Sequence, residues 1–91
     1  MTHAVVLIKA EREGLATLGS QLADVDGVAE AYSVTGHWDF VAILRVRDQK
    51  EVQDVVTSRF SALSGIKDTE TMVAFEAFSQ HDLEALFSIG N

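Results

Sequence analysis

The 91-residue chain lacks cysteine and proline and has few basic residues, and each shortage excludes a class of protein. Without cysteine there is no disulfide, no thiolate nucleophile and no cysteine-ligated zinc, which suits the reducing cytoplasm where we expect this protein. Seven Lys and Arg against 14 Asp and Glu give a formal charge of −7, which disfavours binding to phosphate backbones of nucleic acid. The first apolar run, Ala4–Ile8, is far shorter than the roughly 20 residues of a membrane helix.

Apolar residues, in contrast, are abundant, at 47% of the sequence. The length suits a single domain over residues 1–91. A domain of this size buries only about 60–65% of the surface that its unfolded chain exposes. The composition therefore indicates apolar surface left over for a partner, most simply a second copy of the chain.

Apolar residues repeat at steps of three and four in two segments, which predicts two helices. The first is expected to begin near Arg12–Leu15 and to end before Gly27. The second begins at Asp48, which can cap it, with Glu51 placed to reach back to the backbone, and ends at Gly65. Their apolar faces comprise Leu15, Leu18 and Leu22 in the first and Val52, Val55, Val56, Phe60 and Leu63 in the second.

Four segments are predicted to be strands. Ala4–Lys9 and Trp38–Arg47 are apolar on both alternating faces, which is typical of central strands. Val28–Thr35 and Thr69–Ser79 are mixed and suit the sheet edges. Gly36 lies between the second and third segments and indicates a hairpin turn.

The two halves of the chain repeat the same order of strand, helix, glycine and strand. Val5–Ile8 aligns with Ile43–Val46, and Val25–Val28 with Leu63–Ile66. Right-handed crossovers then place the first strand of each half in the middle of one sheet. The predicted fold is an α+β ferredoxin-like β-α-β-β-α-β sandwich, a four-stranded antiparallel sheet with two helices on one face. A short C-terminal helix is predicted within residues 79–89.

Two helices cover only one face of such a sheet. The other face carries one of two alternate sets, either Phe40, Ala42, Leu44 and Val46 or Val41 and Ile43. Stacking two such faces can bury about 1,200–2,000 Å², the size of a standard interface. We therefore predict at least a homodimer, formed by stacked sheets.

Candidate polar chemistry concentrates at the hairpin and on the last strand. His37 and Asp39 lack further ligands at a metal-binding spacing and lack a nucleophile, so no metal, cofactor or catalytic residue is predicted. Asp39 beside exposed turn amides offers both halves of a zwitterion site, although a turn aspartate can also bond its own backbone. Thr69 and Thr71 share a face and offer hydroxyls to a small ligand, or are ordinary strand residues.

Three segments, Val34–Val41, Leu63–Ile66 and Thr69–Val73, together resemble the ligand-binding domain of the leucine-responsive regulatory protein/AsnC family, the domain for regulation of amino-acid metabolism. The resemblance covers nearly the whole chain. It implies a ferredoxin-like fold, sheet-stacked dimers, rings of octamer or decamer type, and an amino-acid effector bound between dimers. It also implies a ligand site formed by Thr35, Gly36, His37 and Asp39 on the hairpin side and by Thr69 and Thr71 on the strand side.

This sequence departs from the family pattern in two ways. The family turn often reads Gly-Asp-Tyr-Asp, whereas here His37 replaces the first acid and removes a negative charge. Full-length members also carry an N-terminal helix-turn-helix, and the first predicted strand begins too early here to allow one. We expect a stand-alone effector-binding domain that acts in sensing or regulation, with full-length regulators of the family as further partners and without direct binding to nucleic acid or membrane.

Three alternatives stay open on the sequence alone. One is a small dimeric α/β-barrel enzyme, of the cofactor-free monooxygenase or isomerase type, with a pocket inside each protomer. Another is an ACT-like domain, which shares the topology but lacks this hairpin pattern. The third is an assembly partner that binds no ligand.

Overall fold

Strands β1 (Thr2–Ala10), β2 (Val28–Ser33), β3 (Phe40–Val46) and β4 (Ile66–Val73) form one sheet in the order β2-β3-β1-β4. The computed structural model describes residues 1–78, and every pair of neighbouring strands in it is antiparallel. The two strands with apolar residues on both faces are central and the two mixed strands are edges. The predicted strand order and the ferredoxin-like α+β fold are therefore confirmed.

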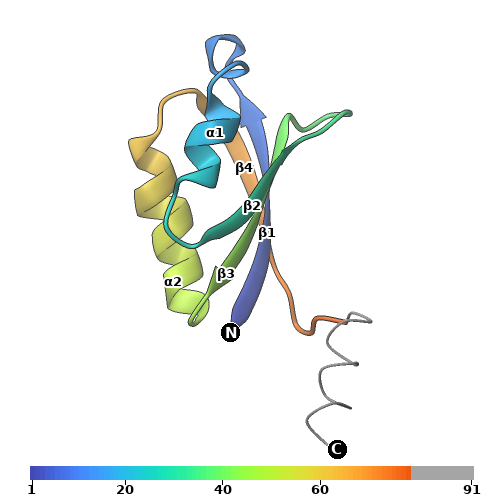
Figure 1. Cartoon of the computed structure of the whole chain (residues 1–91), viewed down its shortest axis with the longest axis vertical. Coiled ribbons are helices and arrows are strands. Elements are labelled where there is room, and N and C mark those ends of the chain that lie inside the picture. The colour runs from blue at the N-terminus through green and yellow to red at the C-terminus, as the bar shows by residue number, and fades with distance from the viewer. Residues whose placement is uncertain (79–91) are drawn as a thin grey trace, which may run out of the picture.

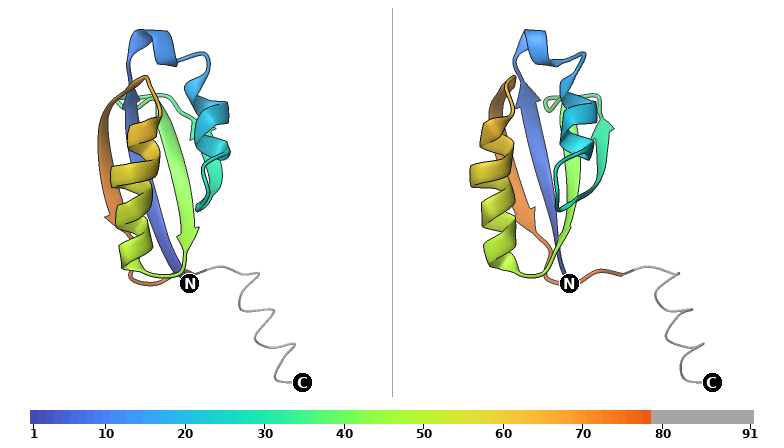
Figure 2. Two further views of the ribbon diagram at one scale, coloured as in Figure 1. Left: turned by 90° about the vertical axis from the view of Figure 1, so that its left-hand side faces the viewer. Right: turned by 60° about the vertical axis from the view of Figure 1, so that its left-hand side comes forward.

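Within residues 1–78, the helical segments lie on one face of the sheet (Figures 1 and 2). A 3₁₀ turn, η1 (Arg12–Gly14), precedes the short helix α1 (Leu18–Ala23). Helix α2 (Gln49–Asp54) continues through a π-helical turn, η2 (Val55–Arg59), into a 3₁₀ turn, η3 (Phe60–Ala62). The two helices predicted from periodicity are present as these two helical segments, and the sheet's other face has no helix over it within residues 1–78.

The first helix is shorter than the periodicity predicted. The chain from Arg12 makes only a single 3₁₀ turn, and regular α-helix begins at Leu18. Glycine disfavours helix by about 1 kcal/mol relative to alanine, and Gly14 interrupts the predicted first turns. Gly14 instead packs on Gly65, where an added Cβ would lie 3.1 Å from the Gly65 Cα. A side chain on Gly14 would crowd this contact, and Gly65 has a φ of +98°, which favours glycine.

The predicted cap of the second helix is confirmed, with a change of one partner. The Asp48 carboxylate accepts a hydrogen bond from the Glu51 backbone N–H at 2.9 Å. The Glu51 carboxylate accepts one from the backbone N–H of Arg47 at 2.8 Å, one residue before the expected donor. The first bond satisfies an N–H group that a helix start leaves without a partner inside the helix, and the second joins the residue before the cap to the first turn.

The core lies between the sheet and the helices. Of the two alternate sets of β3, Phe40, Ala42, Leu44 and Val46 face the helices, and Val41 and Ile43 lie on the uncovered face. The buried residues are Ala4, Val6, Ile8, Ala10, Leu18, Leu22, Phe40, Ala42, Leu44, Val46, Val52, Val55 and Phe60. This alternation fixes which side chains of every strand meet the helices.

Strand β4 begins earlier and ends earlier than the predicted Thr69–Ser79. It begins at Ile66 because its pairing follows β1 as far as Ala10, across a bulge where the register shifts. It ends at Val73, and one further bond joins the Ala74 N–H to the His3 carbonyl of β1. Ser79 and the helix predicted at 79–89 lie outside the described residues.

Candidate functional site

The hairpin between β2 and β3 is the first half of the predicted site. Gly36 lies at its tip with φ of +104°, the left-handed region that glycine tolerates and that the sequence predicted here. The Val34 N–H donates to the Asp39 carbonyl at 3.1 Å, and the Asp39 N–H donates to the Ile8 carbonyl at 2.9 Å. The hairpin therefore projects from the sheet at the end of β1 (Figure 1).

Asp39 holds this hairpin to β1. Its Oδ2 accepts a hydrogen bond from the Ala10 backbone N–H at 2.8 Å. The Lys9 ammonium lies 3.7 Å from the same oxygen and donates to the His37 carbonyl at 2.8 Å. The aspartate thus bonds backbone, but on a neighbouring strand rather than in its own turn. One carboxylate oxygen is committed to the fold, which leaves Oδ1 for any ligand.

Lys9 is a residue that the sequence reasoning missed. It ends an apolar strand, and on sequence alone it marks only a strand boundary. The contact of Lys9 with Asp39 can be inferred only when the pairing of β1 with β3 is known. The register that sets Ile8 opposite Phe40 brings Lys9 beside Asp39. Lys9 also lies opposite Asp68 of β4, so the cation sits between two carboxylate-bearing strands.

The other hairpin residues face outward. Thr35, Gly36 and His37 are exposed, and the His37 ring meets Trp38 edge-on with centroids 5.3 Å apart. Nothing lies within 4 Å of the position that a Gly36 Cβ would take. The polar groups at the tip are therefore open to a ligand or to another protomer.

Thr69 and Thr71 form the second half of the predicted site. They pair with Ile8 and Val6, two buried core residues, so both threonines lie on the helix-covered face of the sheet. Thr69 is half-buried and Thr71 is exposed. Strand β1 separates β4 from β3, so these hydroxyls and the hairpin do not meet within one protomer.

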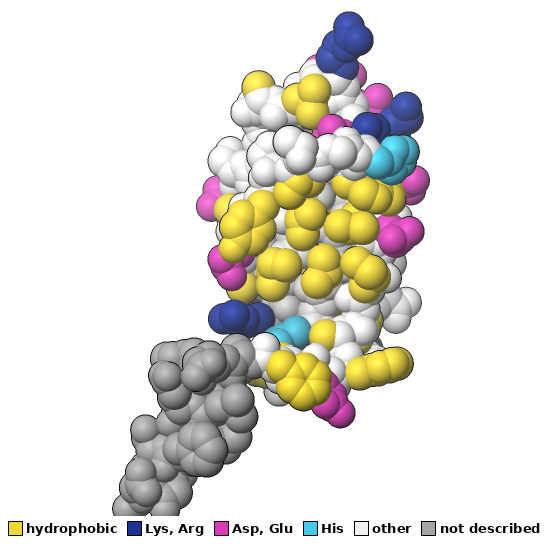
Figure 3. All heavy atoms as spheres, turned by 90° about the vertical axis from the view of Figure 1, so that its right-hand side faces the viewer, with side chains coloured by type: hydrophobic (Ala, Val, Ile, Leu, Met, Phe, Trp, Pro, Cys, Tyr) yellow, Lys and Arg dark blue, Asp and Glu magenta, His cyan; other side chains and the backbone are white. Residues whose placement is uncertain are grey.

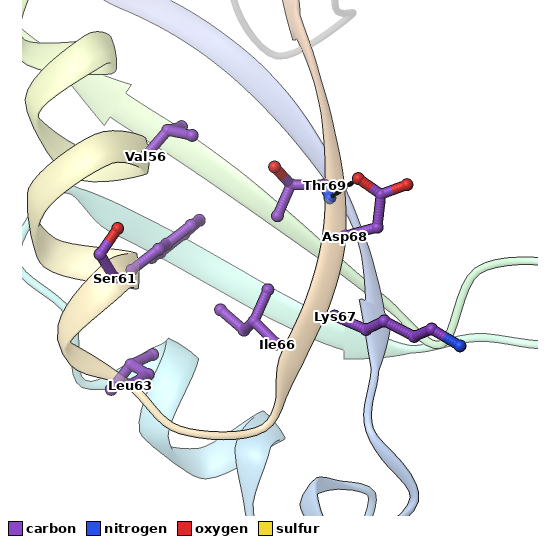
Figure 4. A pocket seen from close by; sticks show the side chains of 8 residues that line it. Val56, Ser61, Leu63, Ile66, Lys67, Asp68 and Thr69 are labelled. Carbon is purple, nitrogen blue, oxygen red and sulfur yellow. Dashed lines mark hydrogen bonds between the residues drawn. The ribbon is translucent and has the colours of Figure 1, made fainter.

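A cavity of about 380 Å³ lies beside Thr69, between the end of the second helical segment and the start of β4 (Figure 4). Figure 4 shows Ile66 and Thr69 pointing from β4 toward the helix, whereas Lys67 and Asp68 point away from it. The full lining is Val56, Phe60, Ser61, Leu63, Ile66, Lys67, Asp68 and Thr69. From the apolar repeat we predicted that Val56, Phe60 and Leu63 pack in the core. The sequence alone does not distinguish residues that line a cavity from residues that are fully packed.

The uncovered face of the sheet carries a continuous group of apolar side chains (Figure 3). Its centre is half-buried and consists of Val5, Leu7, Val41 and Ile43, which the strand register places side by side. Tyr32 and Met72 flank it at 48% and 46% exposure. A hydrogen bond from the phenol to the Glu30 carboxylate raises the pKa of Tyr32 above its ordinary 10.0.

Neither a metal centre nor a membrane segment is present in the part of the chain that the structure describes. Among residues 1–78, no three Asp, Glu or His side chains gather closely enough to hold a metal ion. No helix in that part of the chain has the length and apolar character needed to cross a membrane.

Curated relatives are transcriptional regulators that are longer than this chain. The HTH-type regulator PF0250 of Pyrococcus furiosus is 32% identical over 77 residues, which cover 81% of this chain and 51% of that protein. The HTH-type regulator FL11 of Pyrococcus abyssi is 28% identical over 80 residues, covering 85% and 50%. This chain therefore spans about half the length of the curated relatives it matches.

Solved structures share the fold. TTHA0845 from Thermus thermophilus is 42% identical with a TM-score of 0.81, over 88% of this chain and 100% of that one. AsnC of E. coli is 21% identical with a TM-score of 0.78, over 87% and 54%, and shows the fold alone. NMB0573 of Neisseria meningitidis, solved with L-Met, is 11% identical with a TM-score of 0.76, over 87% and 53%.

The family model for the Lrp/AsnC ligand binding domain matches residues 3–83. This match confirms the resemblance drawn from the hairpin and the Thr-x-Thr pattern. The chain belongs to the Lrp/AsnC ligand-binding domain family.

Proposed function

We propose that the protein is a non-enzymatic effector-binding domain that takes up a free amino acid between dimers of a ring-like homo-oligomer, of octamer or decamer type, and acts in sensing or transcription regulation. The observation that carries this proposal is the separation of the two halves of the site. The hairpin groups and Thr69 lie on either side of β1 in one protomer. A ligand that uses both halves therefore needs two protomers.

Each half supplies a different chemistry. The exposed amides at Gly36 and His37 suit a carboxylate, and Asp39 Oδ1 suits an ammonium. Thr69 offers a hydroxyl at the wall of the cavity, and Thr71 offers a second one along the same strand. We propose that the hairpin of a neighbouring dimer closes over this cavity, so that the zwitterionic part of the ligand lies between the two halves.

The uncovered apolar sheet face supports the dimer within this assembly. Val5, Leu7, Val41 and Ile43 form one surface that no helix covers within the described residues. Stacking two such faces removes apolar area from water, and each Å² of apolar surface buried stabilises the dimer by about 25 cal/mol. An isologous pair of this kind uses the same patch on both subunits.

The comparisons support a regulatory role. The curated relatives are named as transcriptional regulators, and NMB0573 is described in complex with L-Met. We propose that this protein acts in the cytoplasm and that it also assembles with full-length regulators of the family. Its excess of seven negative charges disfavours direct contact with DNA.

The cavity favours binding over the enzyme alternative. An enzyme of that type needs a positioned acid–base pair or nucleophile inside an enclosed pocket. Here the side chains directed into the cavity are apolar or hydroxyl-bearing, and the cavity lies at the edge strand β4. This arrangement can hold a ligand, and it supplies no group to transfer a proton.

Titration of the purified protein with each of the twenty amino acids tests the proposal. We expect heat of binding and a rise in Tm with at least one amino acid at millimolar concentration. Thr69→Val, which keeps the shape and removes the hydroxyl, is expected to weaken that binding by about tenfold. Thr17→Val is the matched control, because the Thr17 side chain is exposed and caps nothing. The absence of any response to all twenty contradicts the proposal.

A further inference from the structure

Residues 74–78 follow β4 as a segment without regular secondary structure, which we call the arm. Its first residue is fixed to the sheet, because the Ala74 N–H donates to the His3 carbonyl of β1 at 2.9 Å. Beyond it, Phe75 is fully exposed and Phe78 is 86% exposed. A solvated tail is usually polar, whereas the only charged residue of the arm is Glu76. The arm therefore presents two aromatic rings that contact little of their own subunit.

The arm leaves the sheet on the side opposite the helices. Figure 1 shows the helices to the left of the sheet and the chain after β4 passing to its lower right. That side is the uncovered face, whose centre is formed by Val5, Leu7, Val41 and Ile43. A second copy stacked on this face lies on the same side of the sheet as the arm. The two rings are therefore directed to where such a partner lies.

We propose that the arm of each protomer packs Phe75 and Phe78 against the sheet of a second copy of this chain. The inference rests on the sheet-stacked dimer of the proposed function and adds a segment that completes its interface. Five residues of extended chain span at most about 16–18 Å, whereas the two sheets of a stacked pair lie about 10 Å apart. The arm is therefore long enough to cross from its own sheet to that of the partner.

The two rings supply contact area that the sheet face cannot supply by itself. The centre of that face is half-buried within one protomer, so each of its side chains offers only part of its area to a partner. An aromatic side chain can bury about 150–250 Å², so four rings, two from each protomer, can bury about 600–1,000 Å². A standard interface buries about 1,200–2,000 Å² in total. Reciprocal packing of two arms, as two-fold symmetry requires, supplies about half of such an interface.

Analytical ultracentrifugation of the whole protein over a range of concentrations tests the arm. Phe75→Ala combined with Phe78→Ala is expected to raise the dissociation constant of the dimer by about tenfold or more. The circular dichroism is expected to stay unchanged, because neither ring belongs to the core. Leu15→Ala is the matched control, because Leu15 is an exposed apolar residue between η1 and α1. Wild-type association in the double variant overturns the inference and leaves the sheet-stacked dimer standing, whereas a monomeric wild type contradicts the proposed function as well.

Cross-linking identifies the copy that the arm contacts, and the absence of native cysteine makes it specific. Ala77→Cys keeps both rings of the arm, and Val5→Cys marks the centre of the uncovered face. A mixture of these two single variants, treated with a bismaleimide after subunit exchange, is expected to give a covalent heterodimer that its mass identifies. Ser20→Cys, at an exposed position on α1, replaces Val5→Cys in the control and is expected to give none. Failure of the first mixture to give the heterodimer overturns the inference, and a link within one chain that carries both cysteines then places the arm on its own sheet.

Discussion

The carboxylate of Asp39 accepts a hydrogen bond from the backbone N–H of Ala10, with 2.8 Å between Oδ2 and the nitrogen. Ala10 is also the residue at which the pairing of β1 with β4 changes register. One side chain therefore connects the base of the hairpin to the strand that separates the two halves of the site. The position of the exposed tip depends on this connection.

Replacing Asp39 with alanine removes the acceptor for the Ala10 N–H. An orphaned, partly buried backbone donor costs about 1–3 kcal/mol, so Asp39→Ala is expected to lower the free energy of unfolding by that amount. Urea unfolding followed by circular dichroism measures the change. Glu13→Ala, at an exposed position, is the control and is expected to change little. Equal stability of the two variants contradicts the role assigned to Asp39.

Lys9→Met tests the second contact of the hairpin. It removes the ammonium that donates to the His37 carbonyl but keeps most of the aliphatic stem. We expect a stability loss below about 1 kcal/mol, since the ion pair is partly exposed. Faster amide exchange is expected at residues 36–39, measured by hydrogen–deuterium exchange. Lys50→Met, at an exposed position on α2, is expected to leave that exchange unchanged. If it has the same effect as Lys9→Met, the contact of Lys9 with the hairpin does not hold the hairpin in place.

Ile43→Glu tests the dimer through the uncovered sheet face. The substitution puts an unpaired charge at the centre of the apolar patch, where burial against a partner is costly. We expect the dissociation constant of the dimer to rise by about 100-fold or more, measured by analytical ultracentrifugation. Gln53→Glu adds the same charge on the exposed face of α2 and is expected to leave the dimer intact. A dimer that persists in Ile43→Glu is formed by another surface.

The Glu51 carboxylate predicts the acid dependence of stability. The hydrogen bond from the Arg47 backbone N–H, aided by the Arg47 and Arg59 guanidinium groups, lowers the pKa of Glu51 below its ordinary 4.5. The stabilisation is therefore present above pH 4.5 and is lost as the pH falls through the lowered pKa of the folded state. Glu51→Gln is expected to show a shallower loss of Tm between about pH 5 and pH 3 than the wild type. Parallel pH profiles for the two proteins contradict this assignment.

The sequence predicted the features that depend on local patterns. Apolar character on both faces identified β1 and β3 as central, and the positive φ of Gly36 matches the predicted turn. The Asp48 cap follows from the spacing to Glu51, which needs no tertiary information. Each of these depends on residues within one turn or one strand. These local preferences are present in the folded structure because the tertiary contacts favour the same conformations.

The features that the sequence did not predict depend on pairing between distant segments. The early start of β4 follows from its bulged register on β1, which shifts between Lys9 and Ala10. That same register decides that Thr69 faces the cavity while Asp68 faces away. The contact between Lys9 and the hairpin likewise needs β1 and β3 side by side. Periodicity reports which residues share a face, but it does not report what lies opposite them.

Native mass spectrometry of the purified protein, with and without each amino acid, tests the central claim most directly. We expect an assembly larger than a dimer, built from an even number of protomers, that retains an amino acid in its protomer–protomer sites. A monomer that retains none of the twenty amino acids would contradict the account.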